Sequence, residues 1–250
     1  MISKNEIKYY SSLLLKKFRQ QENKFIAEGS KVIDEGICSG NKPEIIITTV
    51  PYYESNRKYF ESLQDFRIET VKSTEFNKLT DTKNPQEIIS VFPYAINKFT
   101  IKKVSGNISV YLDNITDPGN AGTIIRNCDW FGITEILMSE ESVDIYNPKV
   151  IRASMGSIFH LKIFDDTSVD DLIKLKINGY KIICSDLQGE DIFNFDRPEK
   201  SVLVFSNEAH GPGERILQTA DHIISIKKKG KAESLNVASA SSIILALMTK

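Results

Sequence analysis

Six short apolar runs in the second half of the chain constrain its fold more than any other feature. They span residues 108–112, 135–138, 161–164, 181–184, 202–205 and 222–226. Helical segments separate most of them, and near-continuous hydrophobic strands joined by crossover helices are typical of a parallel sheet covered on both faces. Ligands of such sheets bind beyond the carboxyl ends of the strands. A functional site is therefore expected in the loops that follow these runs.

The first part of the chain predicts a smaller α/β domain over residues 1–96. A helix is expected over 2–20, where Ile7, Tyr10, Leu14 and Phe18 recur at spacings of three and four. The other predicted elements are helices over 30–38 and 53–63, a strand over 44–49, and further short elements over 68–71, 73–79 and 88–93. A polar, lysine-rich stretch over 97–106 predicts a linker. The second domain then covers 107–250.

Composition excludes several classes of protein. The chain has 250 residues, is 41% hydrophobic and carries a net charge of −1. Its longest late apolar run, 243–248, is far shorter than the roughly 20 residues of a membrane span. A cytoplasmic protein without a membrane partner is predicted. Two basic clusters stand out, one over residues 1–31 and one at Lys227, Lys228, Lys229 and Lys231. Phosphate binding and a solvated surface are both open interpretations of either cluster.

Cysteine and histidine predict no metal site. Cys38, Cys128 and Cys184 are odd in number and lack CxxC spacing, so neither a disulfide framework nor a zinc site is indicated. Each is expected to be a small buried side chain. The three histidines show no metal-ligand spacing either, and His210 is expected to be a satisfied or exposed histidine.

The loop after the first strand runs from Asp117 into a helix. Asn120 suits an N-cap, and Arg126 follows about one and a half turns later. Flanking apolar residues, Trp130 among them, predict a mostly buried helix, in which an arginine needs an anionic partner. A plain turn with a surface arginine is the alternative. The glycine spacing fits neither a dinucleotide fingerprint nor a P-loop.

The loop after residues 202–205 places Ser206, Asn207 and Glu208 directly behind a hydrophobic strand, with Gly211 close by. A carboxylate at the end of a buried strand destabilises the fold unless hydrogen-bond donors or a cation contact it. Two interpretations stand close to even. Glu208 either caps a helix that begins near Pro212, or it has a functional role, in which it orders the ligand loops or holds Arg126.

The loop after the sixth strand passes through Gly230 and enters the last helix at Ser234-Leu235-Asn236. Ser234 suits the N-cap of that helix. Asn236 would then lie within the first turn, where a polar amide needs a specific hydrogen-bond partner. We expect Leu235 to face a ligand and Asn236 to turn toward Arg126.

These three loops resemble the signature motifs of the SpoU/TrmH family of RNA ribose 2′-O-methyltransferases. The segment 147–156 and the opening from Lys16 to Gly29 share the resemblance, which covers nearly the full length. It implies a C-terminal SPOUT domain with a mostly parallel sheet and a trefoil knot in its last third. It also implies a homodimer, and a preceding α/β domain that binds the RNA substrate.

The resemblance also implies roles for particular residues. S-adenosylmethionine would contact Ser206, Gly211, Ile226, Lys228 and Leu235, largely through backbone groups. Arg126 would be the main catalytic residue at the 2′-hydroxyl, with Asn120, Glu208, Ser234 and Asn236 arranging the site. Three positions depart from the family pattern: glycine is usual at Ser206 and common at Ala209, and an Ile-Pro pair is usual where Lys227 stands.

The expected activity is methyl transfer from S-adenosylmethionine to a ribose 2′-hydroxyl of structured RNA. Ribosomal RNA is preferred over transfer RNA as the substrate. Two other classes stay open: a non-catalytic RNA-binding or ribosome-assembly protein on the same fold, and a dinucleotide-dependent enzyme. The intact Arg126, Glu208 and Asn236 argue against the first, and the missing GxGxxG unit argues against the second.

Overall fold

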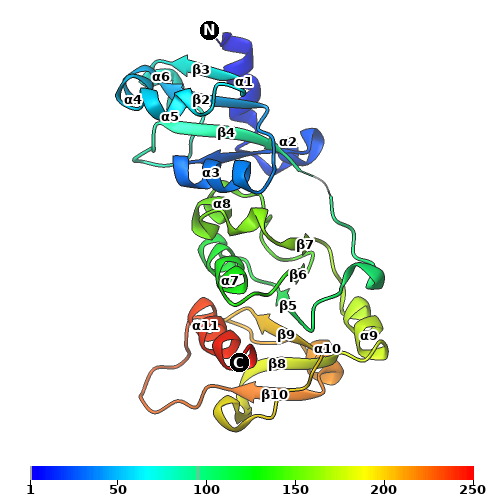
Figure 1. Cartoon of the computed structure of the whole chain (residues 1–250). Helices are drawn as coiled ribbons and strands as arrows, with labels where there is room; N and C mark the ends of the chain where they lie inside the picture. Colours follow the sequence, from blue (N-terminus) through cyan, green and yellow to red (C-terminus); the bar gives the residue numbers. More distant parts are fainter. Residues whose placement is uncertain (1, 95) are drawn as a thin grey trace. The chain divides into compact units, whose positions relative to one another are not determined.

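The computed structural model describes residues 2–94 and 96–250 (Figure 1). Their contacts divide into two compact units. The first unit holds residues 2–94 together with Asp144–Phe159, and the second holds Ile96–Val143 and His160–Lys250. A short segment from the middle of the chain therefore packs with the N-terminal residues.

The first unit is built on a four-stranded mixed sheet with strand order β1-β4-β2-β3. Its strands are β1 (Lys24–Glu28), β2 (Ile45–Thr49), β3 (Ile68–Val71) and β4 (Ile88–Pro93). Only β2 and β3 run parallel. The helices are α1 (Lys4–Ser12), α2 (Lys16–Glu22), α3 (Ser30–Cys38), α4 (Val50–Ser55), α5 (Arg57–Glu61) and α6 (Ser73–Phe76). All residues of β2 are buried.

Two predicted helices are each divided in the structure. The helix expected over 2–20 is α1 followed by α2, because the chain turns at residues 13–15. The guanidinium of Arg19 donates to the carbonyl oxygens of Leu13 and Leu14 at 2.8 Å each, which satisfies carbonyl groups that a continuous helix would have used. The helix expected over 53–63 breaks at Asn56, whose side-chain amide donates to the Tyr52 carbonyl.

The inserted segment contains α8 (Pro148–Ser154) and the 3₁₀ turn η2 (Ser157–Phe159). It is fixed within the first unit by three ion pairs, one of which joins Arg152 to Glu28 at 3.4 Å. Arg19, only 2% exposed, contacts Asp144 at 2.5 Å, and Arg152 contacts Asp81 at 2.7 Å. A buried arginine needs such a partner, so the pairing explains why Asp144 packs with the N-terminal elements.

The second unit is built on a six-stranded sheet with strand order β10-β8-β9-β5-β6-β7. Its strands are β5 (Ile108–Asp113), β6 (Glu135–Met138), β7 (Lys162–Phe164), β8 (Lys181–Asp191), β9 (Ser201–Ser206) and β10 (His222–Ser225). All five pairings are parallel, so the predicted fold class is confirmed. The trefoil knot stays a prediction.

The remaining elements cover this sheet. They are η1 (Ile101–Lys103), α7 (Pro118–Trp130), α9 (Val169–Ile177), η3 (Ile192–Asn194), α10 (Glu214–Thr219) and α11 (Val237–Met248). Helices α7 and α11 pack together, and the Asn127 amide joins them by donating to the Ala238 carbonyl and the Ser241 hydroxyl, at 3.0 Å each. Among the described residues, no helix is long and apolar enough to cross a membrane.

Three burial predictions were wrong. Trp130 is 82% exposed and Arg126 is also exposed, because both project from the side of α7 opposite its buried residues such as Ile124 and Cys128. Burial therefore gives Arg126 no need for an anionic partner. Cys38 is exposed at the end of α3, whereas Cys128 and Cys184 are buried as expected.

Candidate active site

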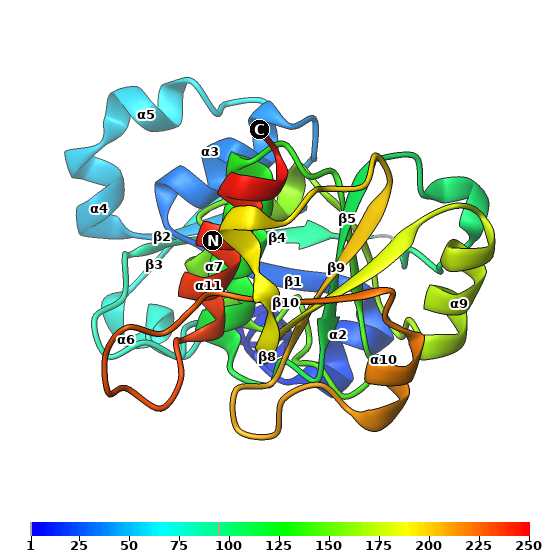
Figure 2. The ribbon, with the colours of Figure 1, turned by 90° about the horizontal axis from the view of Figure 1, so that it is seen from below.

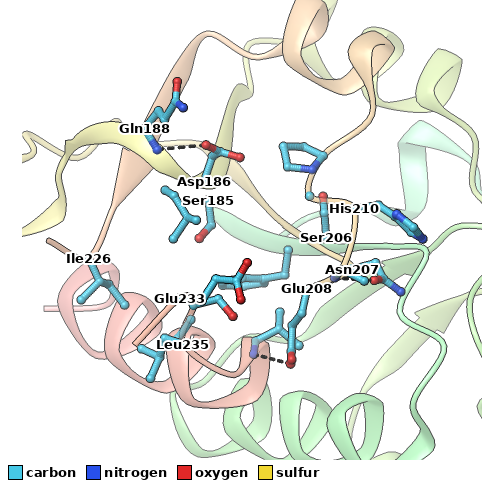
Figure 3. Close-up of a pocket in the computed structure, with 18 residues that line it drawn as sticks. Ser185, Asp186, Gln188, Ser206, Asn207, Glu208, His210, Ile226, Glu233 and Leu235 are labelled. Carbon is cyan, nitrogen blue, oxygen red and sulfur yellow. Dashed lines mark hydrogen bonds between the residues drawn. The ribbon is translucent and has the colours of Figure 1, made fainter. Parts of the chain in front are cut away.

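A cavity of about 700 Å³ opens at the carboxyl ends of β9 and β10, beside the middle of β8 (Figure 3). Parallel sheets bind ligands at this edge. The wall contributed by β8 includes Ser185, Asp186 and Gln188, and Ile226, Glu233 and Leu235 come from the segment between β10 and α11. The third wall is the loop after β9, which contributes residues 206–212.

Glu208 joins the three predicted motif loops at this cavity. Its Oε1 atom accepts hydrogen bonds from Asn120 Nδ2 at 3.0 Å, Asn236 Nδ2 at 2.9 Å and the Val237 amide at 2.8 Å. Asn236 Nδ2 also donates to Asn120 Oδ1 at 2.9 Å. The carboxylate thus stands at the N-terminus of α11, where amide groups and the helix dipole favour negative charge. Of the two interpretations of Glu208, loop ordering is the one that this geometry supports.

The helix caps differ from those predicted. Asn236 is the N-cap of α11, and its side-chain oxygen accepts from the amides of Ala238 and Ser239. Ser234 lies two residues earlier, exposed at the cavity wall. For α7 the N-cap is Asp117, whose side chain accepts a hydrogen bond from the Asn120 backbone amide at 2.8 Å. The Asn120 side chain is not used as a cap and points toward Glu208. The helix α10 begins at Glu214 after Gly213, and Glu208 does not cap it.

Asn207 holds the loop after β9 against the loop after β5. Its side-chain amide donates to the Asn114 carbonyl at 3.1 Å, and its side-chain oxygen accepts from the Ala209 amide at 2.8 Å. The turn then closes when the Gly211 amide donates to the Asn207 carbonyl. Gly211 has φ +64°, a left-handed conformation that glycine adopts without strain. These contacts fix the position of Glu208 within the loop.

Four of the five residues predicted to contact a cofactor line the cavity: Ser206, Gly211, Ile226 and Leu235. Lys228 is exposed and is not part of the lining. Among the residues expected to act on the substrate, Glu208 and Ser234 line the cavity, and Asn120 and Asn236 are bonded to Glu208.

Arg126 lies apart from this network. It follows Asn120 by six residues, about 9 Å along the helix axis. Within the described part of the chain it forms no ion pair with Glu208, and the Asn236 side chain is bonded to Asn120 and Glu208. The alternative in which Glu208 holds Arg126, and the prediction that Asn236 turns toward Arg126, were therefore wrong. The reason is the helical geometry, since the Arg126 side chain leaves α7 at a different angle from that of Asn120.

The structure adds lining residues that the sequence had not suggested. Asp186 and Gln188 belong to β8, and Asp186 Oδ1 accepts from the Gln188 amide at 2.9 Å. Glu233 lines the opposite wall. Asp186 follows the predicted strand 181–184 by two residues, so its place at a strand end was a usable signal.

Lys227, where the family pattern has proline, is anchored by its side chain. Lys227 Nζ donates to the Gly189 carbonyl of β8 at 2.6 Å. Gly189 is itself required by close packing, because a Cβ there would lie 2.4 Å from the Ile224 backbone of β10. The hydrogen bond from Lys227 to β8 therefore fixes the start of the β10–α11 loop, at the position where the family pattern has proline.

A second cavity, of about 530 Å³, lies at the carboxyl ends of β5, β6 and β7. Its acidic lining includes Asp113, Glu140, Glu141 and Asp166. Burial raises the pKa of Asp113 above its ordinary range, and the negative charge of Glu141 adds to the increase. Among the described residues, no group of three or more histidine, cysteine, aspartate or glutamate side chains could hold a metal ion.

Comparison with known proteins identifies the family. Residues 107–246 match the model of the SpoU rRNA methylase family, and residues 4–90 match that of the MRM3-like substrate binding domain. The first match covers more than half of the chain, so this protein belongs to the SpoU rRNA methylase family. The resemblance found in the sequence is thereby confirmed.

The similarity to individual relatives extends over nearly the full length of this chain. The chain is 29% identical over 247 residues to the 23S rRNA (guanosine(2553)-2′-O)-methyltransferase RlmP of Bacillus subtilis, which covers 97% of this chain and 96% of that protein. An AdoMet-bound rRNA methyltransferase from Sinorhizobium meliloti superposes with a TM-score of 0.84 at 26% identity, covering 99% and 95% of the two chains. The SpoU methyltransferase AviRb of Streptomyces viridochromogenes, at 24% identity, shares the fold with a TM-score of 0.86, covering 99% and 97%.

Proposed function

We propose that this protein transfers a methyl group from S-adenosylmethionine to a ribose 2′-hydroxyl of structured RNA, with ribosomal RNA as the substrate. The observation that carries the proposal is the Glu208 network. It joins the loops after β5, β9 and β10 at the rim of one cavity through Asn120, Asn236 and the Val237 amide. This convergence is what a site for two substrates, a small cofactor and an RNA strand, requires.

The cavity lining is suited to S-adenosylmethionine. Phe205, Ile226 and Leu235 offer apolar surface for an adenine ring, and Asp186 and Glu233 offer carboxylates for a cationic sulfonium and amine. Ser206, Gly211, Ile226 and Leu235 are the residues proposed to hold it, together with the backbone of Lys228 at the rim. When bound, the cofactor would supply a methyl group, whose bond to the sulfonium sulfur breaks as its bond to the ribose 2′-oxygen forms, with the hydroxyl proton released to water.

The chain itself has to orient the 2′-hydroxyl and balance its charge. We assign the orientation to Arg126, whose exposed guanidinium can contact the hydroxyl or the adjacent phosphate through several N–H donors. An arginine stays protonated, so it stabilises developing negative charge on the oxygen and does not remove the proton as a base. Asn120, Glu208, Ser234 and Asn236 would keep the loops in the reactive arrangement.

The first unit is proposed to bind the RNA. Its match to a substrate binding domain supports this role, as does its charge of 16 basic against 14 acidic side chains. Ribosomal RNA is favoured over transfer RNA because the relative RlmP, aligned over 97% of this chain, is named for methylating 23S rRNA. Transfer RNA remains the second arm of the test.

A cytoplasmic homodimer is the form in which we expect the protein to act. Helix α11 is strongly apolar, and Ile243, Ala246 and Leu247 on its outer side are only partly buried within one chain. A helix that is apolar almost all round is normally covered on both sides. A second copy would cover this side and could approach the exposed Arg126. Sedimentation analysis that finds only a monomer at micromolar concentration would contradict this assembly.

The activity is tested by incubating the purified protein with methyl-labelled S-adenosylmethionine and unmodified ribosomal or transfer RNA, followed by mapping of the labelled nucleotide. Label at one ribose of ribosomal RNA is the expected result. Cofactor binding without label in either RNA would overturn the proposal. Failure to bind S-adenosylmethionine in calorimetry would favour a non-catalytic RNA-binding protein, and binding of a nicotinamide dinucleotide in its place would favour an oxidoreductase.

A further inference from the structure

The carboxyl edge of the six-stranded sheet divides its charges unequally among its loops. Acidic side chains without any lysine or arginine occur in the loops after four strands: Asp117 after β5, Glu140 and Glu141 after β6, Asp165 and Asp166 after β7, and Glu208 after β9. The end of β8 carries Asp186, Glu190 and Asp191. Across the described residues of these strand-end loops, only the segment after β10 is basic, with lysine at 227, 228, 229 and 231.

This lysine segment is unusual within its own unit. The second unit has 16 basic and 19 acidic side chains, a net charge of −3, and a quarter of its basic side chains fall within these five residues. A solvated surface needs no such concentration. A polyanion that approaches the acidic edge, by contrast, requires a positive contact point beside the cavity, because unscreened carboxylates repel it within about 10 Å.

All four lysines of this segment are exposed beside the cavity. Ile226 and Glu233, at the two ends of the segment, both line the cofactor cavity, so the lysines between them stand at its rim. The loop projects away from the sheet between β10 and α11 (Figures 1 and 2). At its tip, a Cβ on Gly230 would meet no atom within 4 Å.

The ammonium groups of the segment differ in their contacts. Lys227 Nζ is committed to the Gly189 carbonyl. Lys229 and Lys231, on either side of Gly230, are exposed, and within residues 2–94 and 96–250 neither side chain forms a hydrogen bond or an ion pair. Their charge is therefore available to a ligand.

We propose that Lys229 and Lys231 bind backbone phosphates of the substrate RNA next to the ribose that enters the cavity. The two charge signs at this edge would then serve different partners. Carboxylates on the cavity wall, Asp186 and Glu233, face a cationic cofactor, and the lysines at the rim face the polyanion. Lysine binds phosphate as a compact point charge without a fixed direction, which suits contacts to a backbone of any sequence. The inference rests on the proposed RNA substrate.

The test measures RNA binding separately from methyl transfer. Unmodified 23S rRNA is titrated with the full-length protein at several salt concentrations, in the presence of S-adenosylhomocysteine. For Lys229→Gln/Lys231→Gln we expect the magnitude of the slope of log K against log salt to fall by about 1.4 to 1.8, since each lost phosphate contact removes about 0.7 to 0.9. The RNA Kd should rise about 3- to 10-fold near 0.15 M salt, and Lys229→Arg/Lys231→Arg should keep the slope.

Lys98→Gln/Lys102→Gln is the matched control, because it removes two exposed lysines of the same unit from the segment that precedes β5, at the amino edge of the sheet. A slope that changes no more in the Lys229/Lys231 variant than in this control overturns the inference. So does an equal loss of S-adenosylmethionine affinity, which would make the loop a cofactor contact. Loss of a dimer in sedimentation would assign the lysines to a subunit contact and would overturn it as well.

The two proposals can fail independently. If the wild-type protein binds the RNA with a steep salt dependence but transfers no methyl group, the proposed function fails while the lysine contact is still measured. If methylation is normal and the variant keeps the wild-type KM for RNA and the wild-type slope, only the lysine contact fails.

Discussion

Two glutamates, one in each unit, organise their surroundings in opposite ways. Glu28 is 3% exposed and accepts from Thr80 at 2.7 Å, the Gln86 amide at 3.0 Å and the cation of Arg152 at 3.4 Å, with both carboxylate oxygens in use. Glu208 is exposed and accepts three hydrogen bonds from uncharged donors on Oε1 alone. Oε2 of Glu208 forms no hydrogen bond with any described residue.

The difference separates a structural carboxylate from a functional one. Burial with a cation and several donors satisfies Glu28 fully, so its removal leaves orphaned polar groups in the fold. Glu208, by contrast, is exposed and uses only one of its two oxygens to join three loops. Such a carboxylate adds little to the stability of the fold. It is instead able to keep a binding site in one arrangement while ligands enter.

The largest effect is expected at Arg126, on turnover alone. Arg126→Ala should lower kcat about 100- to 1000-fold, the usual cost of losing a donor to developing charge. The S-adenosylmethionine Kd should stay within about 2-fold, because Arg126 is not part of the cavity lining. Single-turnover methylation and calorimetry provide the two measurements. Arg126→Lys should recover part of the rate, since charge remains but the planar fork of donors is lost. Equal losses of turnover and cofactor affinity would show that the role is misassigned.

The next effect is on stability, at Glu28. Glu28→Ala should lower the free energy of unfolding by about 3 kcal/mol, because it leaves the Thr80 hydroxyl and the Gln86 amide without their acceptor and Arg152 without one of its carboxylates. Arg152 keeps Asp81, which limits the loss. Urea unfolding followed by circular dichroism measures the change. A variant as stable as wild type would remove the basis for calling Glu28 structural.

Glu208→Gln should reverse that pattern. Turnover is expected to fall about 10-fold, because an amide oxygen accepts hydrogen bonds more weakly than a carboxylate and the three loops lose part of their order. The free energy of unfolding should change by less than about 1 kcal/mol, since the site is exposed. The same two assays, run beside the Glu28 variant, decide between the roles. A loss of stability as large as that of Glu28→Ala would erase the contrast.

The smallest effect is a gain, at Asp113. Its pKa is raised in the folded state above the ordinary value of about 3.9, so its contribution to stability is greatest below that pH and is lost as pH rises through the folded pKa. Asp113→Asn should therefore stabilise the protein at pH 7 by no more than about 1 kcal/mol. The gain should shrink toward zero near pH 4 in urea unfolding. A gain of the same size at both pH values would attribute it to packing.

Much of the second unit followed from its sequence. Six apolar runs predicted six strands, and all six pair in parallel, because buried strands leave continuous hydrophobic segments that crossover helices interrupt. The first unit was less regular, and its opening helix was predicted as one piece. Apolar spacing of three and four continues across residues 13–15, so periodicity could not reveal a turn that Arg19 stabilises from a later position.

Within the site, the sequence predicted which loops meet but misassigned their local roles. Ser234 and Asn120 are good N-cap residues, yet Asn236 and Asp117 occupy the caps. The preference for a cap is nearly the same among serine, asparagine and aspartate, so the partner across the site decides. That partner is Glu208. Its carboxylate accepts hydrogen bonds from the side-chain amides of Asn120 and Asn236, so the Asn120 side chain does not cap α7 and Asn236 is held at the start of α11.

The sequence by itself determined the family, the parallel sheet and the three loops that line one edge of it, because apolar runs and motif residues are local along the chain. Only the tertiary structure decided that Glu208 contacts Asn120 and Asn236 and not Arg126, that Arg126 and Trp130 are exposed, and that residues 144–159 pack with the first unit. Those outcomes depend on the angle at which each side chain leaves its element and on partners up to 125 residues away, as for Arg19 and Asp144. A sequence pattern within one segment specifies neither the direction of a side chain nor its partner in a distant segment.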